Sequence, residues 1–171
     1  MWILGFLLLF LSVPGLQGQT AAPVTAENVQ LPPPQPLPFN HKVHVSLGLE
    51  CLSCHPIEGP GIKAGLPAET QCMLCHASIK KDSPAIQKLA THQSSGKPLP
   101  WTRIYTVPSY VWFSHQSHHQ ATGLDCELCH EKVAERDVLV KEKPTSMEFC
   151  MDCHAERVAP TGCDFCHGNA E

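Results

Sequence analysis

Ten cysteines and five of the eleven histidines lie in five copies of one short motif. Each copy reads C-x-x-C-H, and no cysteine lies outside the copies. This spacing is the attachment signature of c-type haem, in which two thiols bond to the porphyrin vinyl groups and the adjacent histidine ligates the iron from the proximal side. The motif therefore predicts five covalently bound haem c groups. The predicted attachment residues are Cys51, Cys54, Cys72, Cys75, Cys126, Cys129, Cys150, Cys153, Cys163 and Cys166, and the predicted proximal ligands are His55, His76, His130, His154 and His167.

Other uses of paired cysteines explain the pattern less well. Disulfides suit an exported chain, but they give no reason for a histidine after every pair. A zinc ribbon uses C-x-x-C pairs, but it needs no histidine at a fixed place, and an odd number of pairs leaves one without a partner. A thioredoxin-like redox motif expects a βαβ setting, which is absent here. Haem attachment accounts for every copy.

Six histidines remain for the distal side of the haems, and six-coordinate irons would need five. Four come from an internal repeat, F-x-H-x-x-H, which begins at Phe39 and again at Phe113 and precedes a C-x-x-C-H motif each time. Histidines at i and i+3 share a helix face but diverge enough to serve two different irons. Met147 is a further candidate, although the histidines already suffice in number. The predicted distal ligands are His41, His44, His92, His115 and His118, with His119 as the alternative.

The elements that position these residues must be short. Sixteen prolines and eleven glycines interrupt the chain, and aromatic residues make up only 6% of it. Outside one apolar N-terminal segment the chain is poor in large apolar side chains, so porphyrins rather than a protein core are expected to fill the interior. The expected fold class is a mostly irregular chain with short α-helices and little β, packed on haems, and unfolded without them.

A long gap between the second and third motifs divides the chain into modules. The expected organisation is a dihaem c7-like module over residues 39–93, a connector over 94–112 and a trihaem c7-like module over 113–171. Ser83 before Pro84 predicts the start of a short helix that continues through His92. Thr145 followed by Glu148 forms a capping-box pattern that predicts a helix carrying the fourth motif.

The N-terminus predicts export. Residues 2–11 are almost uniformly apolar, a length typical of a signal-peptide h-region and short for a membrane span. Residues 1–20 are therefore interpreted as a signal peptide with cleavage at about 18–22, and residues 21–38 as a Pro-rich linker. An uncleaved segment lying at the membrane is the alternative. The expected location is periplasmic, with membrane proximity through this segment if it stays attached.

F-x-H-x-x-H followed by repeated C-x-x-C-H resembles the class III multihaem cytochromes c, the cytochrome c3 and c7 group. Residues 113–167 are similar to a complete trihaem c7 unit, and residues 97–115 resemble the link in pentahaem members, some of which belong to membrane quinol-oxidising complexes related to alternative complex III. The chain departs from such members at Tyr105, where they often have a histidine ligand. The resemblance implies that His41 and His115 each serve the haem attached just downstream, that His44 and His118 reach other haems, and that His92 serves the haem on Cys72 and Cys75.

The expected function is a relay of single electrons between periplasmic or membrane redox partners. Bis-His ligation closes both axial positions, which favours electron transfer over substrate binding. A multihaem reductase needs an open iron, and the chain has no C-x-x-C-K motif and little length for a substrate pocket, so it is not expected to be an enzyme. The alternative is a structural electron-transfer subunit of a membrane quinol oxidoreductase or of a cytochrome filament. The net charge of −4 excludes a nucleic-acid partner and favours a partner with a basic face.

Overall fold

The structure of the protein, a computed structural model, describes residues 31–123 and 125–168. Over these residues the chain forms short helices joined by loops, without a β-strand, which confirms the expected fold class. The predicted signal peptide, its cleavage site, residues 21–30 of the predicted linker and residues 169–171 lie outside this part. No helix in the described part is long and apolar enough to cross a membrane. The helices are α1 (His41–Ser46), α2 (Cys51–Cys54), α3 (Glu69–His76), α4 (Pro84–Ser95), α5 (His115–Ala121), α6 (Glu127–His130), the 3₁₀ turn η2 (Val133–Glu135), α7 (Met147–Glu156) and α8 (Cys163–His167).

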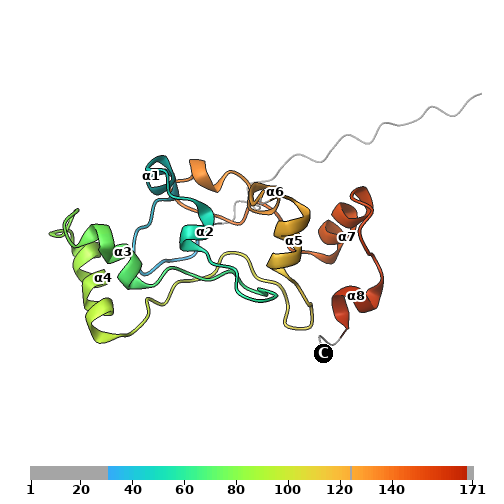
Figure 1. The fold of residues 1–171 in the computed structure, drawn as a ribbon, viewed down its shortest axis with the longest axis horizontal. Helices are drawn as coiled ribbons and strands as arrows, with labels where there is room; N and C mark the ends of the chain where they lie inside the picture. Colours follow the sequence, from blue (N-terminus) through green and yellow to red (C-terminus); the bar gives the residue numbers. More distant parts are fainter. Residues whose placement is uncertain (1–30, 124, 169–171) are drawn as a thin grey trace, which may run out of the picture.

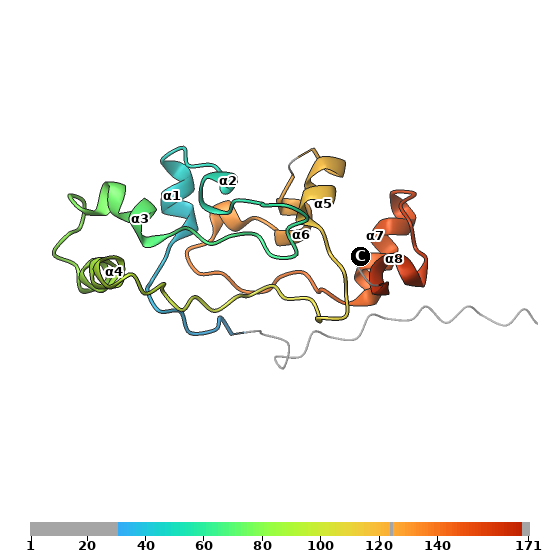
Figure 2. The ribbon, with the colours of Figure 1, turned by 60° about the horizontal axis from the view of Figure 1, so that its bottom comes forward.

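The molecule is elongated, and its helices are spaced one after another along the long axis (Figure 1). Helices α3 and α4 lie at one end, α7 and α8 lie at the other, and α1, α2, α5 and α6 lie between them in both views (Figures 1 and 2). Each C-x-x-C-H motif lies on or at the end of a helix: α2, α3, α6, α7 and α8. The five motifs are therefore spread along the molecule rather than gathered around one centre.

The two F-x-H-x-x-H repeats form the same local structure. Asn40 caps α1 by accepting a hydrogen bond from the Val43 amide at 2.9 Å, and Ser114 caps α5 by accepting one from the Ser117 amide at 3.1 Å. Both residues have extended backbone angles, as N-caps do. The cap fixes where each helix starts, so the first histidine of each repeat is the first helical residue.

Only three apolar side chains in the described part are buried: Leu37, Leu89 and Leu99. They form one cluster between the α3–α4 pair and the segments before α1 and after α4. Leu37 belongs to the predicted Pro-rich linker, so the described end of that segment packs on the molecule instead of acting as a free spacer. Hydrogen bonds between Gln35 and Thr102, at 2.8 and 3.0 Å, reinforce this contact.

Two predicted helix starts have different outcomes. Helix α4 begins at Pro84 with Ser83 at its N-cap, as predicted, and Gly96 ends it in the left-handed conformation with φ +67°. Helix α7 carries the fourth motif as expected, but Ser146 and not Thr145 is its cap, accepting from the Phe149 amide at 3.3 Å. The Thr145 hydroxyl instead donates to the Thr106 carbonyl at 2.8 Å.

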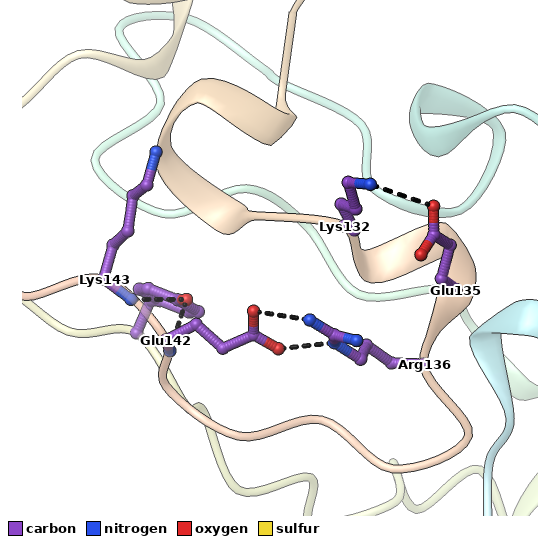
Figure 3. Close-up of polar contacts among 6 residues, drawn as sticks. Lys132, Glu135, Arg136, Glu142 and Lys143 are labelled. Atoms are coloured by element: carbon purple, nitrogen blue, oxygen red, sulfur yellow. Dashed lines mark hydrogen bonds and ion pairs between the residues drawn. The ribbon is translucent and has the colours of Figure 1, made fainter.

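The two predicted modules are joined by direct contacts. The Lys42 amide in α1 donates to the Arg136 carbonyl after η2 at 3.1 Å, and the Asn40 amide group donates to the Asp137 carboxylate at 2.7 Å. Arg136 in turn pairs with Glu142 through two contacts, 2.5 and 2.8 Å long (Figure 3). These ties fix α1 against the loop that follows the third motif.

Candidate haem-binding sites

Four of the five motif histidines face a second histidine across a gap. Ring centroids are 6.3 Å apart for His41 and His55, and 6.2 Å apart for His44 and His76. The second repeat gives the same arrangement. There the centroids are 6.5 Å apart for His115 and His130, and 6.0 Å apart for His118 and His154. The first histidine of each repeat thus faces the next motif along the chain, and the second histidine faces the motif after that.

The gap between facing rings fits one metal ion. Metal–imidazole nitrogen bonds are about 2 Å long, and adding the distance from each nitrogen to its ring centre gives a centroid separation of roughly 6 Å for two imidazoles on one iron. The four measured separations lie at this value. Direct stacking of two rings in contact would bring them closer, as for Phe39 and His44 at 4.4 Å. The rings are held apart by the amount that axial ligation on both faces of a haem requires.

Backbone carbonyls orient most of these rings through Nδ1. A carbonyl oxygen only accepts, so each bond places the proton on Nδ1 and leaves Nε2 unprotonated for a metal. His115 Nδ1 donates to the Gly61 carbonyl at 2.6 Å, and His55 Nδ1 donates to the Gly65 carbonyl at 2.9 Å. The same bond is made at 2.7 Å by His44 to Asn40 and by His118 to Ser114, at 3.0 Å by His76 to Ile79, and at 2.5 Å by His154 to Pro160.

Comparison with known proteins agrees with this geometry. Residues 111–168 match the family described as cytochrome c7 and related cytochrome c, and residues 17–99 match the class III cytochrome c family. The menaquinone reductase multihaem cytochrome c subunit of Nitratidesulfovibrio vulgaris (strain Hildenborough) is 33% identical over 147 residues, which cover 79% of this chain and 68% of that protein. The chain belongs to the class III cytochrome c family. It is a multihaem c-type cytochrome, a carrier of electrons.

Burial favours the neutral form of His41, His115 and His130. The pKa of His41 falls to about 4, first because the ring is desolvated and then because His55 and His44 lie close. Desolvation also lowers the pKa of His115 and of His130. A neutral imidazole is the form that ligates a metal, so these rings are ready to bind iron at neutral pH without first losing a proton.

The cysteines of the five motifs form a chain of neighbours. Desolvation raises the pKa values of the Cys72 and Cys126 thiols most. The next cause is a thiol of another motif close by, Cys54 for Cys72 and Cys51 for Cys126. In the same way, after desolvation, Cys153 raises the pKa of Cys129 and Cys166 raises the pKa of Cys150. The motifs therefore follow one another along the molecule in the order second, first, third, fourth, fifth, which matches the order of their helices in Figure 1.

Two histidines predicted from the sequence face no motif histidine in the described part. His92 lies on α4 with its Nδ1 donating to the Lys97 carbonyl at 2.8 Å, at the end of the molecule far from α8 (Figure 2). His44, not His92, faces His76. His119 has a buried Nδ1 without a hydrogen-bond partner. His167, the predicted proximal histidine of the fifth motif, has its Nδ1 3.4 Å from the Tyr110 carbonyl.

Several residues that orient the histidines, or the helices that carry them, were not identified from the sequence. The caps Asn40 and Ser114 could have been found, because Asn or Ser before a helical repeat is a strong N-cap signal. Gly61 and Gly65 gave no such signal, since their carbonyls meet His115 and His55 only in the folded chain. Tyr105 contacts the third motif. Its hydroxyl accepts from the Glu142 amide at 3.0 Å, and its ring packs edge-on against His130 at 4.6 Å.

Proposed function

We propose that this chain is an exported pentahaem cytochrome that relays single electrons along its length. The observation that carries the proposal is the set of four histidine pairs, each spaced for one iron. The ten cysteines supply attachment for five haems. Periplasmic location follows from haem attachment and from the apolar N-terminal segment.

When bound, haem c supplies one-electron oxidation and reduction of its iron. The residues of the chain decide how that iron is held. Nδ1 bonds to carbonyls fix the ring planes and make the Nε2 atoms better donors, and ligands on both faces leave no open position for a substrate. Such sites favour electron transfer over catalysis.

The order of the attachment sites supports a single path. An electron entering at the second motif would pass through the first and third to reach the fourth and fifth. The central step crosses between the two halves, where Cys51 and Cys126 interact and where Gly61 in one half holds His115 in the other. With so little apolar core, haem edges stay close to the surface at both ends, where partners dock.

The name of the similar protein from Nitratidesulfovibrio vulgaris indicates the kind of partner that this chain would have. That protein is a cytochrome subunit of a menaquinone reductase, and we propose that this chain likewise serves as an electron-transfer subunit of a membrane quinone complex. Affinity purification from solubilised membranes should recover the chain together with integral membrane subunits. Recovery as a soluble monomer would contradict the proposed complex but not the electron relay. Recovery as a long homopolymer would indicate a filament.

The relay is tested by breaking it at its centre. C126A/C129A removes the third haem, and C72A/C75A, the matched control, removes a haem from one end. After flash photoreduction, transient absorption should show fast redistribution of electrons within the wild type and the control. In C126A/C129A the two groups of haems should exchange electrons only in a slow phase that depends on protein concentration. Fast, concentration-independent redistribution in that variant would contradict the path.

A further inference from the structure

The fifth motif differs from the other four because no histidine faces it in the described part. The connector covers the Nδ1 side of His167: the Tyr110 carbonyl lies 3.4 Å from Nδ1, and the Trp112 amide donates to the Cys166 carbonyl at 2.8 Å. Nε2 is the nitrogen left for iron. The sixth ligand of this haem must therefore come from another element.

Besides His167, two histidines lie outside the facing pairs, and both are poorly placed for this role. His92 lies on α4, and both views put α4 and α8 at opposite ends of the long axis (Figures 1 and 2). His119 follows His118, which already faces His154, and its Nδ1 is enclosed without a partner. A different residue type is needed beside α8.

Met147 is a methionine on α7, the helix that lies beside α8. It is the first residue of α7, and its side chain is 70% exposed although it is apolar. Met73, by contrast, packs against the leucine cluster, and Met151 lies between the two cysteines of its own motif. An exposed methionine at a helix start gains nothing from packing in the protein alone, so a bound group would give it a role.

The contacts of α7 with α8 are made from the side of α7 on which helical spacing puts Met147. Residues three apart share a face of a helix, so Met147 lies one turn before Cys150 on the same side. Cys150 lies close enough to Cys166 for the two thiols to interact. Farther along α7, His154 contacts the Phe165 ring in α8 at 6.4 Å. The two helices lie side by side at the end of the molecule in both views.

We propose that the Met147 thioether is the sixth ligand of the haem attached at Cys163 and Cys166, opposite His167. The inference rests on the proposed five-haem function and deepens it. Thioether sulfur is an established axial ligand of c-type haem, and His/Met ligation raises the reduction potential relative to bis-His ligation. The haem at the α8 end then has the highest potential, so electrons run from the α3 end to the α8 end and leave there.

The test reads the ligand directly. Oxidised wild-type protein should show the sulfur-to-iron charge-transfer absorption band of one His/Met haem, and the reduced protein should show strongly shifted methionine proton resonances. M147L should lose both and gain one high-spin haem by EPR. M147H should keep that haem low-spin, without the sulfur band and with a lower potential. M151L, the matched control, should behave as wild type.

Three results would overturn the assignment: a wild type without the sulfur band, a band that persists in M147L, or a high-spin fifth haem in the wild type. If H92A instead removes low-spin ligation from that haem, and dilution of the wild type does the same, the ligand comes from His92 of a second copy. Intact mass separates this failure from a failure of the proposed function. Five haems with no sulfur ligand contradict only the Met147 assignment, whereas fewer than five contradict the pentahaem relay.

Discussion

The two F-x-H-x-x-H units share their local geometry but not their surroundings. In the first unit Phe39 stacks on His44 with ring centroids 4.4 Å apart, and in the second Phe113 stacks on His118 at the same 4.4 Å. Yet all three buried leucines lie near the first unit, and residues 113–123 and 125–168 contain no buried apolar side chain. The histidine geometry is therefore set locally by the capped helix, with ring separations that suit one metal ion between the members of each pair. The apolar core adds stability to one half only.

The sharpest test of this equivalence removes the second histidine of each unit. H44A should convert the haem on Cys72 and Cys75 to high-spin, and H118A should do the same to the haem on Cys150 and Cys153, since each iron loses its sixth ligand. EPR of the oxidised protein counts the change as one haem in each variant. H92A is the control and should leave the haem on Cys72 and Cys75 low-spin. A high-spin haem on these cysteines in H92A but not in H44A would reverse the assignment.

A core substitution should affect the two halves unequally. Leu89 is 3% exposed, and L89A should cost about 2–5 kcal/mol because it leaves a cavity in a cluster of only three leucines. L31A makes the same chemical change at a side chain that is 79% exposed and should change stability by less than about 0.5 kcal/mol. Hydrogen exchange followed by mass spectrometry should show lost protection in α3 and α4, with α7 and α8 unchanged. Equal loss in both halves would show that the core supports the whole molecule.

Gly61 links the two halves, and replacing it should weaken that link. Gly59 and Gly61 both have positive φ, +60° and +63°, so alanine costs about 1–3 kcal/mol at either position. At Gly61 a Cβ would also lie 2.8 Å from Ile57 Cγ2, whereas at Gly59 it meets nothing. G61A should therefore be less stable than G59A, and it should shift the potential of the haem on Cys126 and Cys129 because its carbonyl holds His115. Identical spectra and stabilities for the two variants would leave Gly61 with no positioning role.

The smallest effect is expected at the ion pair of the second half. The hydrogen bond from Arg136 lowers the pKa of Glu142, so the pair stabilises the fold above the ordinary carboxyl pKa and loses this contribution as the pH falls through the lowered value. E142Q should remove that acid-range change in the unfolding midpoint, and added salt should reduce the wild-type effect. E135Q breaks the looser Lys132–Glu135 pair at 3.5 Å and serves as control. An acid-range change of equal size in E142Q would assign it to other carboxylates.

Much of the chemistry could be predicted from the sequence because it is local. Covalent attachment needs a cysteine spacing and a neighbouring histidine, and both are visible along the chain. The start of α4 at Ser83 and Pro84 is local in the same sense, and it was predicted correctly. The cap of α7 was placed one residue early, because Thr145 found a partner in Thr106 that is remote in the sequence.

The long-range pairings could not be derived in that way. His44 and His76 are brought together only by the folded chain, whereas the family resemblance had assigned His92 to the haem on Cys72 and Cys75. The carbonyls of Gly61 and Gly65 carry no side-chain signal. The distal ligands and the number of haems stay predictions that direct measurement must test.

The proposed electron path requires five haems bound in a row to one chain. Intact mass of the protein purified from its native host under denaturing conditions tests it most directly, because thioether bonds survive denaturation and axial ligands do not. The expected mass is that of the chain plus five haems, with one haem fewer in C126A/C129A. A fully matured protein carrying four haems or fewer would contradict it.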